Sequence, residues 1–302
     1  MGYTVMCHMT HSCVVVGLRR CCCSVALLLA LSGVGAFAAE LASEDEVDAL
    51  MRAGGVYLDV DELSHQLVGE IESEISQLDP GQSMSNAEQQ ATLRAARRAF
   101  DSDRMDVVIQ DVLEANLSTE DVADRLDAYS TEFGRHLIAI EFTEKRRAPG
   151  PEYQADVDAF ESGEAFAWRR DAITDMYRRH DVASDQARMY IDTQIAVLTG
   201  LSGAVPALDS DMIARMENAL LDRHSEFEEV FAASGVGFTG WLYRDLDDAA
   251  FIRAMRFNDS LSARRVHIAL MAGYREAIVS GGLIYGREVV RELRAAKSLV
   301  EI

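Results

Sequence analysis

Residues 117–136, LSTEDVADRLDAYSTEFGRH, and residues 246–265, LDDAAFIRAMRFNDSLSARR, follow the same pattern at a spacing of 129 residues. Each stretch begins with a helix N-cap candidate, Ser118 or Asp247, whose side-chain oxygen can accept a hydrogen bond from an amide of the first turn. In the first stretch, Asp121 follows Ser118 by three residues, which is a weak form of the capping box. The pattern predicts the same helical unit twice in one chain.

Each copy also contains a predicted turn between two helices. It consists of a second cap candidate, a small residue three positions later, and then an arginine. In the first copy these residues are Thr131, Gly134 and Arg135, and in the second they are Ser260, Ala263 and Arg264. Apolar residues at spacings of three and four flank the first turn, as expected for helices with one buried face. We therefore expect a helix-turn-helix in each copy, with architecture as its main role.

At these residues the chain resembles a bacterial family of exported all-helical proteins, catalogued as a domain of unknown function. The family signature reads roughly [ST]-x-x-E-L, a spacer, and F-Y-x-S-P-x-G-x-[KR]; here residues 128–136 read AYSTEFGRH and residues 257–265 read FNDSLSARR. The segment 243–249, YRDLDDA, is similar to the Y-R-D-L-S-D-A of the family. Both copies lack the proline of the signature and the second lacks its glycine, which predicts looser turns.

The resemblance implies an exported helical protein and brings no established activity. It identifies a set of motif residues with a structural or partner-binding role. These are Tyr129, Thr131, Phe133, Gly134, Arg135, Tyr243, Arg244, Asp245, Phe257, Ser260 and Arg264.

The N-terminus has the layout of a secretory signal peptide. Arg19 and Arg20 precede an apolar run over residues 21–36, and Ala36-Phe37-Ala38 offers a small-x-small cleavage site. The apolar run is shorter than the roughly 20 residues that span a bilayer, which favours cleavage over a retained anchor. We expect cleavage near Ala38 and a periplasmic or secreted protein. All five cysteines precede this site, so no disulfide, thiolate nucleophile or zinc-thiolate site is expected afterwards.

Composition restricts the partners of residues 39–302. They contain 27 Lys and Arg against 50 Asp and Glu, a formal net charge of −23, because residues 1–38 hold only Arg19 and Arg20 as charged residues. This charge repels phosphate backbones and anionic membranes, so nucleic-acid binding is not expected. No later stretch has 18 consecutive apolar residues, so no stable membrane span is expected after cleavage.

The sequence has only four prolines, and helix-favouring residues dominate the intervals between them. It therefore predicts an all-α fold. The breaker cluster Ala148-Pro149-Gly150-Pro151 predicts a seam between two related helical bundles, residues 39–147 and 152–302, which follow the signal peptide of residues 1–38. Expected helices cover residues 44–54, 59–78, 86–100, 103–115, 118–130, 131–146, 152–180 with a break near 162–163, 183–203, 208–233, 247–258, 260–280 and 283–297.

No catalytic, cofactor or metal signature emerges. Residues 235–240, GVGFTG, match the dinucleotide fingerprint GxGxxG, but a helical stretch precedes them instead of a strand, so a helix C-cap and flexible connection is the better prediction. His224 and Glu228 are four residues apart and could lie on one face of a helix, but no third ligand accompanies them to complete a metal site. Acid pairs such as Asp245 with Asp247, or Glu226 with Glu229, are expected by chance in so acidic a chain.

Three hypotheses of function remain open at this point. The first is a non-enzymatic cell-envelope protein that binds an unknown protein partner through an apolar groove near the repeated motif. The second is a carrier that encloses an apolar ligand, such as a lipid or fatty acid, between its helices. The third is a hydrolase of envelope polymers that uses paired carboxylates.

Overall fold

The computed structural model describes residues 40–78, 84–145, 151–205 and 207–300. The predicted signal peptide and residues 146–150 of the predicted seam lie outside the described residues. Within the described part the chain is helical, with one isolated β-bridge between Leu41 and Ser118 and no strand. The all-α prediction is therefore confirmed.

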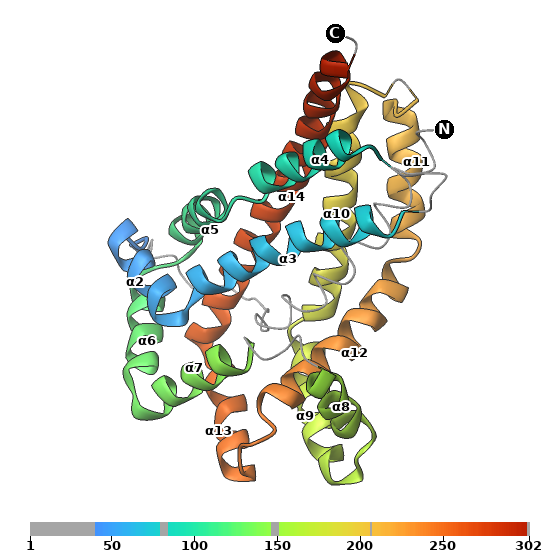
Figure 1. The fold of residues 1–302 in the computed structure, drawn as a ribbon. Helices are drawn as coiled ribbons and strands as arrows, with labels where there is room; N and C mark the ends of the chain where they lie inside the picture. The colour runs from blue at the N-terminus through green and yellow to red at the C-terminus, as the bar shows by residue number, and fades with distance from the viewer. Residues whose placement is uncertain (1–39, 79–83, 146–150, 206, 301–302) are drawn as a thin grey trace.

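Helices before the predicted seam follow one another through short connections (Figure 1). They are α2 (Glu44–Gly54), α3 (Val56–Ser76), α4 (Asn86–Ala99), α5 (Ser102–Asn116), α6 (Thr119–Ser130) and α7 (Glu132–Lys145). Capping boxes at Ser43, Ser85 and Ser118 stop the chain from fraying where α2, α4 and α6 begin.

Beyond the seam, α8 and a short 3-10 helix precede a second series that matches the first in order and closely in length. The elements are α8 (Pro151–Ser162), η2 (Glu164–Phe166), α9 (Ala167–Arg179), α10 (Val182–Ser202), α11 (Ser210–Leu221), α12 (His224–Leu242), α13 (Asp248–Asn258) and α14 (Leu261–Val300). For example, α3 and α10 both contain 21 residues. The last helix departs from the match, because α14 has 40 residues against 14 in α7.

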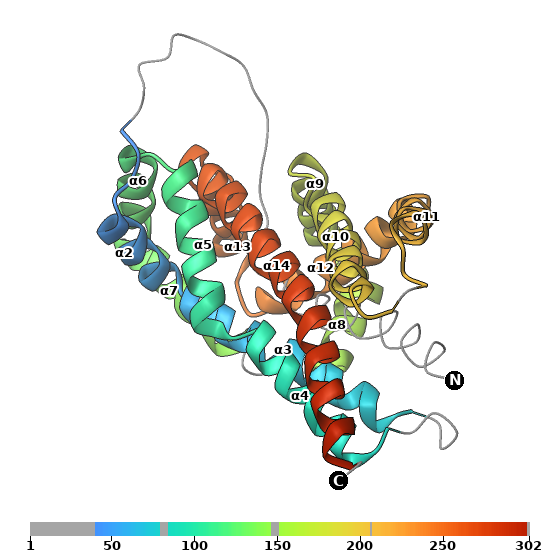
Figure 2. The ribbon, with the colours of Figure 1, turned by 90° about the horizontal axis from the view of Figure 1, so that it is seen from above.

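The long helix α14 ties the two halves of the chain together. It packs against α4, α5 and α6 of the first half and against α10 of the second, and Figure 2 shows it lying between α5 and α10. The largest hydrophobic cluster combines residues of both halves, among them Val60, Ile109, Tyr190 and Ile278. A second cluster joins α7, through Leu137, to α8, α9, α12 and α13. Two separate tandem bundles are therefore not confirmed.

Glycines allow α10 and α14 to approach at backbone distance. A Cβ atom placed on Gly200 would lie 2.4 Å from the Leu283 carbonyl oxygen and 2.9 Å from the Gly286 Cα. A Cβ atom on Gly286 would lie 2.3 Å from the Val197 carbonyl oxygen. Both positions exclude any side chain, so this crossing depends on glycine in both helices.

Three expected helix boundaries were wrong. Residues 208–233 are not one helix, because α11 ends at Leu221 and α12 begins at His224. Residues 235–240 are not a helix end and connection: they lie inside α12, where side chains of α8 and α9 fill the space beside the glycines. Residues 260–280 and 283–297 form the single helix α14, because Gly281 and Gly282 pack closely against Phe100 and the Thr193 carbonyl. The predicted break at Ser162-Gly163 is confirmed.

No helix within the described residues combines the length and the apolar character that crossing a bilayer requires.

Candidate functional site

The two predicted turns have matching hydrogen bonds. The Thr131 hydroxyl donates to the Ala128 carbonyl (2.8 Å) and accepts from the Gly134 amide (2.9 Å). In the second copy the Ser260 hydroxyl donates to the Phe257 carbonyl and accepts from the Ala263 amide, both at 3.3 Å. The second turn, without the glycine, is the looser one.

The arginines of the turns have equivalent roles. Arg135 donates to the Ser130 carbonyl, and Arg264 Nε donates to the Asp259 carbonyl at 3.2 Å. Each guanidinium thus satisfies a carbonyl at the end of the preceding helix, a group that helix geometry leaves without a partner. Arg264 also pairs with the Asp259 carboxylate at 2.6 Å.

The two copies pack against each other. Arg125, in α6, lies between the rings of Tyr129 and Phe257, 4.4 Å from each ring centre. Its Nη1 donates to the Phe257 carbonyl at 3.2 Å. Phe133 packs edge-on against Phe257, with ring centres 6.1 Å apart. Residues of both copies, 129 positions apart in the sequence, therefore form one aromatic and cationic cluster.

An ion pair adds to this contact. Arg265 Nη1, at the start of α14, lies 2.8 Å from Asp121 Oδ1. Asp121 is also the capping-box residue of α6, where its other carboxylate oxygen accepts from the Ser118 hydroxyl at 2.7 Å. The same carboxylate thus caps one copy and binds the other.

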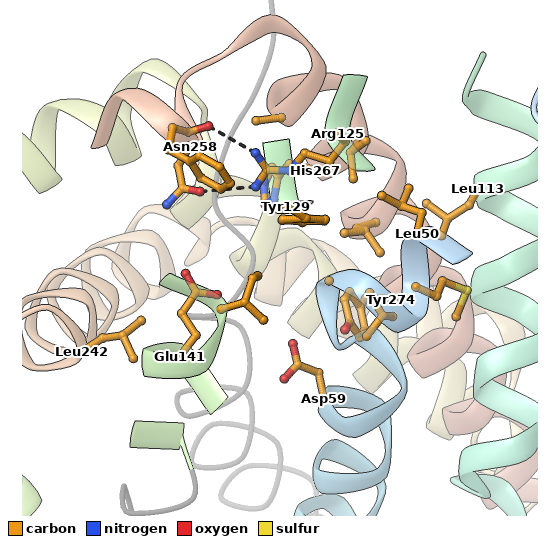
Figure 3. A pocket seen from close by; sticks show the side chains of 18 of the residues that line it. Leu50, Asp59, Leu113, Arg125, Tyr129, Glu141, Leu242, Asn258, His267 and Tyr274 are labelled. Carbon is orange, nitrogen blue, oxygen red and sulfur yellow. Dashed lines mark hydrogen bonds between the residues drawn. The ribbon is translucent and has the colours of Figure 1, made fainter. Parts of the chain in front are cut away.

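A cavity of about 100 Å³ lies against this cluster and is lined by residues of α2, α3, α5, α6, α7, α9, α12, α13 and α14 (Figure 3). Its apolar lining includes Leu50, Leu113 and Leu242. Its polar lining includes one arginine, one histidine, one asparagine, two carboxylates and three tyrosines. These are Arg125, His267, Asn258, Asp59, Glu141, Tyr129, Tyr243 and Tyr274.

A hydrogen-bonded chain runs along the cavity wall. The Tyr243 hydroxyl donates to Glu141 Oε1 (2.6 Å) and accepts from Asn258 Nδ2 (3.2 Å). The Asn258 side-chain oxygen lies 3.5 Å from Arg125 Nη2, a long contact. Burial and the Glu141 carboxylate raise the pKa of Tyr243 well above its usual value, so the phenol stays protonated and remains a donor.

One buried polar atom at this cavity, Arg125 Nε, has no hydrogen-bond partner in the described protein. The side chains of Tyr129 and His267 line the cavity beside it. Burial, with Arg125 and His180 nearby, holds the pKa of His267 well below its usual range, so the ring is neutral at pH 7. A buried donor without a partner costs free energy that a bound molecule could recover.

Arg169 positions the loop that carries Tyr243. This arginine is buried in α9, and its Nη2 donates to the Leu246 carbonyl and to Asp248 Oδ1, both at 2.7 Å. It also stacks near the Phe251 ring at 4.9 Å. The loop between α12 and α13 is therefore anchored to α9, which keeps the Tyr243 hydroxyl directed toward Glu141.

The motif residues named from the sequence separate into three groups. Tyr129, Tyr243 and Phe257 line the cavity, and Phe133 packs beside them. The turn residues Thr131, Gly134, Arg135, Ser260 and Arg264 stabilise the turns. The remaining two lie apart from the cavity lining: Arg244 pairs with Glu144 at 2.6 Å, and the Asp245 side chain is 88% exposed.

Sequence reasoning missed Arg125, Glu141, Asn258 and His267. Arg125 carried one usable signal, since it precedes Tyr129 by one helical turn on the predicted apolar face of α6. The other three become neighbours only through the contact between the two copies, which no local pattern encodes.

The other chemical candidates do not assemble into a site. Asp247 caps α13, and Glu226 forms a 2.8 Å ion pair with Arg223, so neither acid pair is enclosed as a catalytic pair. The described residues contain no group of three or more His, Cys, Asp or Glu side chains that could hold a metal ion.

No protein-family model, curated protein or solved structure matches the chain. The chemistry of the cavity and of the two facing copies is therefore the basis on which a function can be inferred.

Proposed function

We propose that this protein is a non-enzymatic binding protein of the cell envelope, which holds a small polar molecule in the cavity between its two helix-turn-helix copies. The observation that carries this proposal is the cavity, whose wall contains the buried, unpartnered Nε of Arg125 together with tyrosine, histidine and asparagine side chains. Such convergent polar groups in a concave site are typical of small-molecule recognition.

The proposal includes an origin of the site by duplication. The matching order of α2 to α7 and α9 to α14 and the equivalent hydrogen bonds of both turns support two related halves, residues 39–147 and 152–302. In this account each copy supplies one wall of the cavity, and the aromatic residues of the motif hold the walls together.

The cavity supports a polar ligand better than the lipid or fatty acid of the alternative hypothesis. Its volume of about 100 Å³ lies below the roughly 300–1,000 Å³ typical of drug-sized ligand pockets. Arg125 lines it, and a hydrocarbon tail would leave its buried Nε desolvated without compensation.

A protein partner is a second candidate, supported by exposed apolar side chains in the second copy and in α9 beside it. Trp168, Ile252 and Leu261 are 39%, 42% and 64% exposed, although large apolar residues are usually buried. Crosslinking in intact cells from a photoreactive residue at position 252 would test this candidate. A single crosslinked protein, lost on changing Trp168 to Ser, would favour it.

Native mass spectrometry of the protein purified gently from its own envelope tests the cavity. The mass under native conditions should exceed the mass after denaturation by one small molecule, and the processed chain should begin near Ala39. Ile138→Trp, which fills the cavity, should remove the bound mass, whereas Ile252→Trp on the exposed face of α13 should retain it. Equal native and denatured masses for the wild-type protein would contradict the proposal.

A further inference from the structure

The cavity contains a buried cation without a carboxylate partner. Arg125 is only 7% exposed. Within the described part of the chain its hydrogen bonds go to two uncharged acceptors, the Phe257 carbonyl at 3.2 Å and, over a long 3.5 Å, the Asn258 side-chain oxygen. Arginine is rarely buried to this extent without a paired acid, because an unpaired charge in the interior is costly. A ligand that carries a negative charge would supply the missing partner.

One edge of the Arg125 guanidinium is suited to a carboxylate. The rings of Tyr129 and Phe257 lie against the guanidinium, each with its centre 4.4 Å from the guanidinium carbon. The Nε–H group makes no hydrogen bond, and Nη2 makes only the long contact with Asn258. Because Nε and Nη2 lie on the same edge, they match the two oxygens of a carboxylate, and charge-assisted pairs of this kind are the stronger hydrogen bonds.

The charges of the cavity wall favour an anion with a single negative charge. Arg125 is the only lysine or arginine among the described residues that line the cavity. The two carboxylates of the wall, Asp59 and Glu141, have partners of their own within the protein, and Figure 3 shows both well apart from Arg125. One guanidinium neutralises one negative charge, whereas a dianion such as phosphate would bring a second charge without a partner into the cavity.

The size and the remaining lining of the cavity favour a short hydrocarbon chain. Leu50, Leu113 and Leu242 supply apolar surface. The volume is about 100 Å³, and an apolar cavity of about 150 Å³ can hold benzene, which has six heavy atoms. By this comparison the cavity suits about four or five heavy atoms, the size of acetate or propionate. A longer fatty acid would not fit.

We infer that the ligand is a short-chain monocarboxylate, whose carboxylate binds the Nε edge of Arg125 and whose hydrocarbon part packs against the leucines of the wall. This inference rests on the proposed function and names the ligand class of the same cavity. The His267 ring and the Tyr129 hydroxyl also line the cavity and can each donate a hydrogen bond to the carboxylate. The guanidinium thereby gains an ion pair that the described part of the chain does not provide.

Isothermal titration calorimetry of the purified protein with four compounds tests the inference. Propionate carries the charge, propionamide has the same size without the charge, octanoate has the charge on a longer chain, and inorganic phosphate is an anion without a hydrocarbon part. We expect propionate to bind at least about tenfold more tightly than each of the others, since a hydrogen bond to a charged group contributes about that factor. Equal affinity for propionamide or phosphate, tighter binding of octanoate, or no binding of propionate would overturn the inference.

Variants at two arginines assign the carboxylate to its site. Arg125→Lys keeps the charge and loses the planar pair of N–H groups, so propionate should bind about tenfold more weakly. Arg265→Lys is the matched control and should bind propionate as the wild type does, because Arg265 joins the same two copies through Asp121 and is not among the described residues that line the cavity. Ile138→Trp should abolish binding by filling the cavity. Equal affinities in Arg125→Lys and Arg265→Lys would overturn the assignment to Arg125.

The two proposals fail in distinguishable ways. A bound molecule in native mass spectra that is not a monocarboxylate would overturn this inference and leave the binding function intact. An absence of both bound mass and propionate binding would overturn both proposals. Circular dichroism melts of each variant separate loss of binding from loss of folding, and the comparison of propionate with propionamide requires only the wild-type protein.

Discussion

Replacing Gly200 by alanine tests the close crossing of α10 and α14 that unites the two halves. The added Cβ would lie 2.4 Å from the Leu283 carbonyl oxygen and 2.9 Å from the Gly286 Cα. Both contacts are backbone atoms, which cannot move aside as a flexible side chain could, so the helices must separate. Overpacking costs about 1–3 kcal/mol, and this site belongs at the upper end.

Helix propensity acts in the opposite direction. Alanine is favoured over glycine by up to about 1 kcal/mol in a helix, which leaves Gly200→Ala about 2 kcal/mol less stable than wild type. Gly69→Ala is the matched control, because Gly69 is exposed within α3 and a Cβ there would meet no atom within 4 Å. That variant should be up to about 1 kcal/mol more stable.

Thermal unfolding followed by circular dichroism at 222 nm gives the comparison. For a chain of this size, 1 kcal/mol shifts Tm by roughly 2–4 °C, so Gly200→Ala should lower Tm by about 4–8 °C and Gly69→Ala should raise it slightly. Equal, small increases in Tm for both variants would show that α10 and α14 do not approach at backbone distance, and would refute the reasoning.

Three further predictions concern the site and the contact between copies. Tyr243→Phe should reduce the free energy of unfolding by about 1–3 kcal/mol, because Glu141 and Asn258 lose their hydrogen bonds to the hydroxyl. Tyr129→Phe should change the free energy of unfolding by less than about 0.5 kcal/mol. Similar midpoints of urea unfolding for the two variants would contradict the geometry of the cavity wall. Burial and Arg264 lower the pKa of His180 to about 4. The free energy of unfolding is therefore unaffected by this histidine above the unfolded pKa near 6.5, and it decreases as the pH falls from 6.5 toward 4, because the unfolded chain takes up the proton more readily. The decrease in the free energy of unfolding should reach about 3 kcal/mol, and His267 acts in the same direction. The variant His180→Gln should show a smaller dependence of this free energy on pH. A wild-type free energy of unfolding that stays constant from pH 6.5 to 4.5 would refute the prediction. A double-mutant cycle on Asp121→Ala and Arg265→Ala should give a coupling energy of about 0.5–1 kcal/mol in favour of the pair, and additive effects would mean that the ion pair between the copies contributes nothing.

Local signals in the sequence predicted the local structure well. Ser118, Thr131, Asp247 and Ser260 cap helices in the structure, since a side-chain cap depends only on residues within one turn. The same local reasoning failed at glycines. Residues 235–240 satisfy every local criterion for a connection, yet a Cβ on Gly235 would lie 2.2 Å from the Tyr177 ring. Close packing against α9 requires glycine there and keeps it within a helix.

The candidate site was predictable only in part. Tyr129, Tyr243 and Phe257 were identified through the repeated motif, and all three line the cavity. Arg125 and Asn258 come from opposite copies, and their meeting depends on how α6 packs against the end of α13. Such contacts between distant segments are set by tertiary packing, which periodicity and capping signals do not describe.

A high-resolution crystal structure of the protein purified gently from its own envelope tests the central claim most directly. The account predicts density for one small polar molecule in the cavity between the two copies, in contact with Arg125. Only water in the cavity, or a molecule bound solely on another surface, would contradict it.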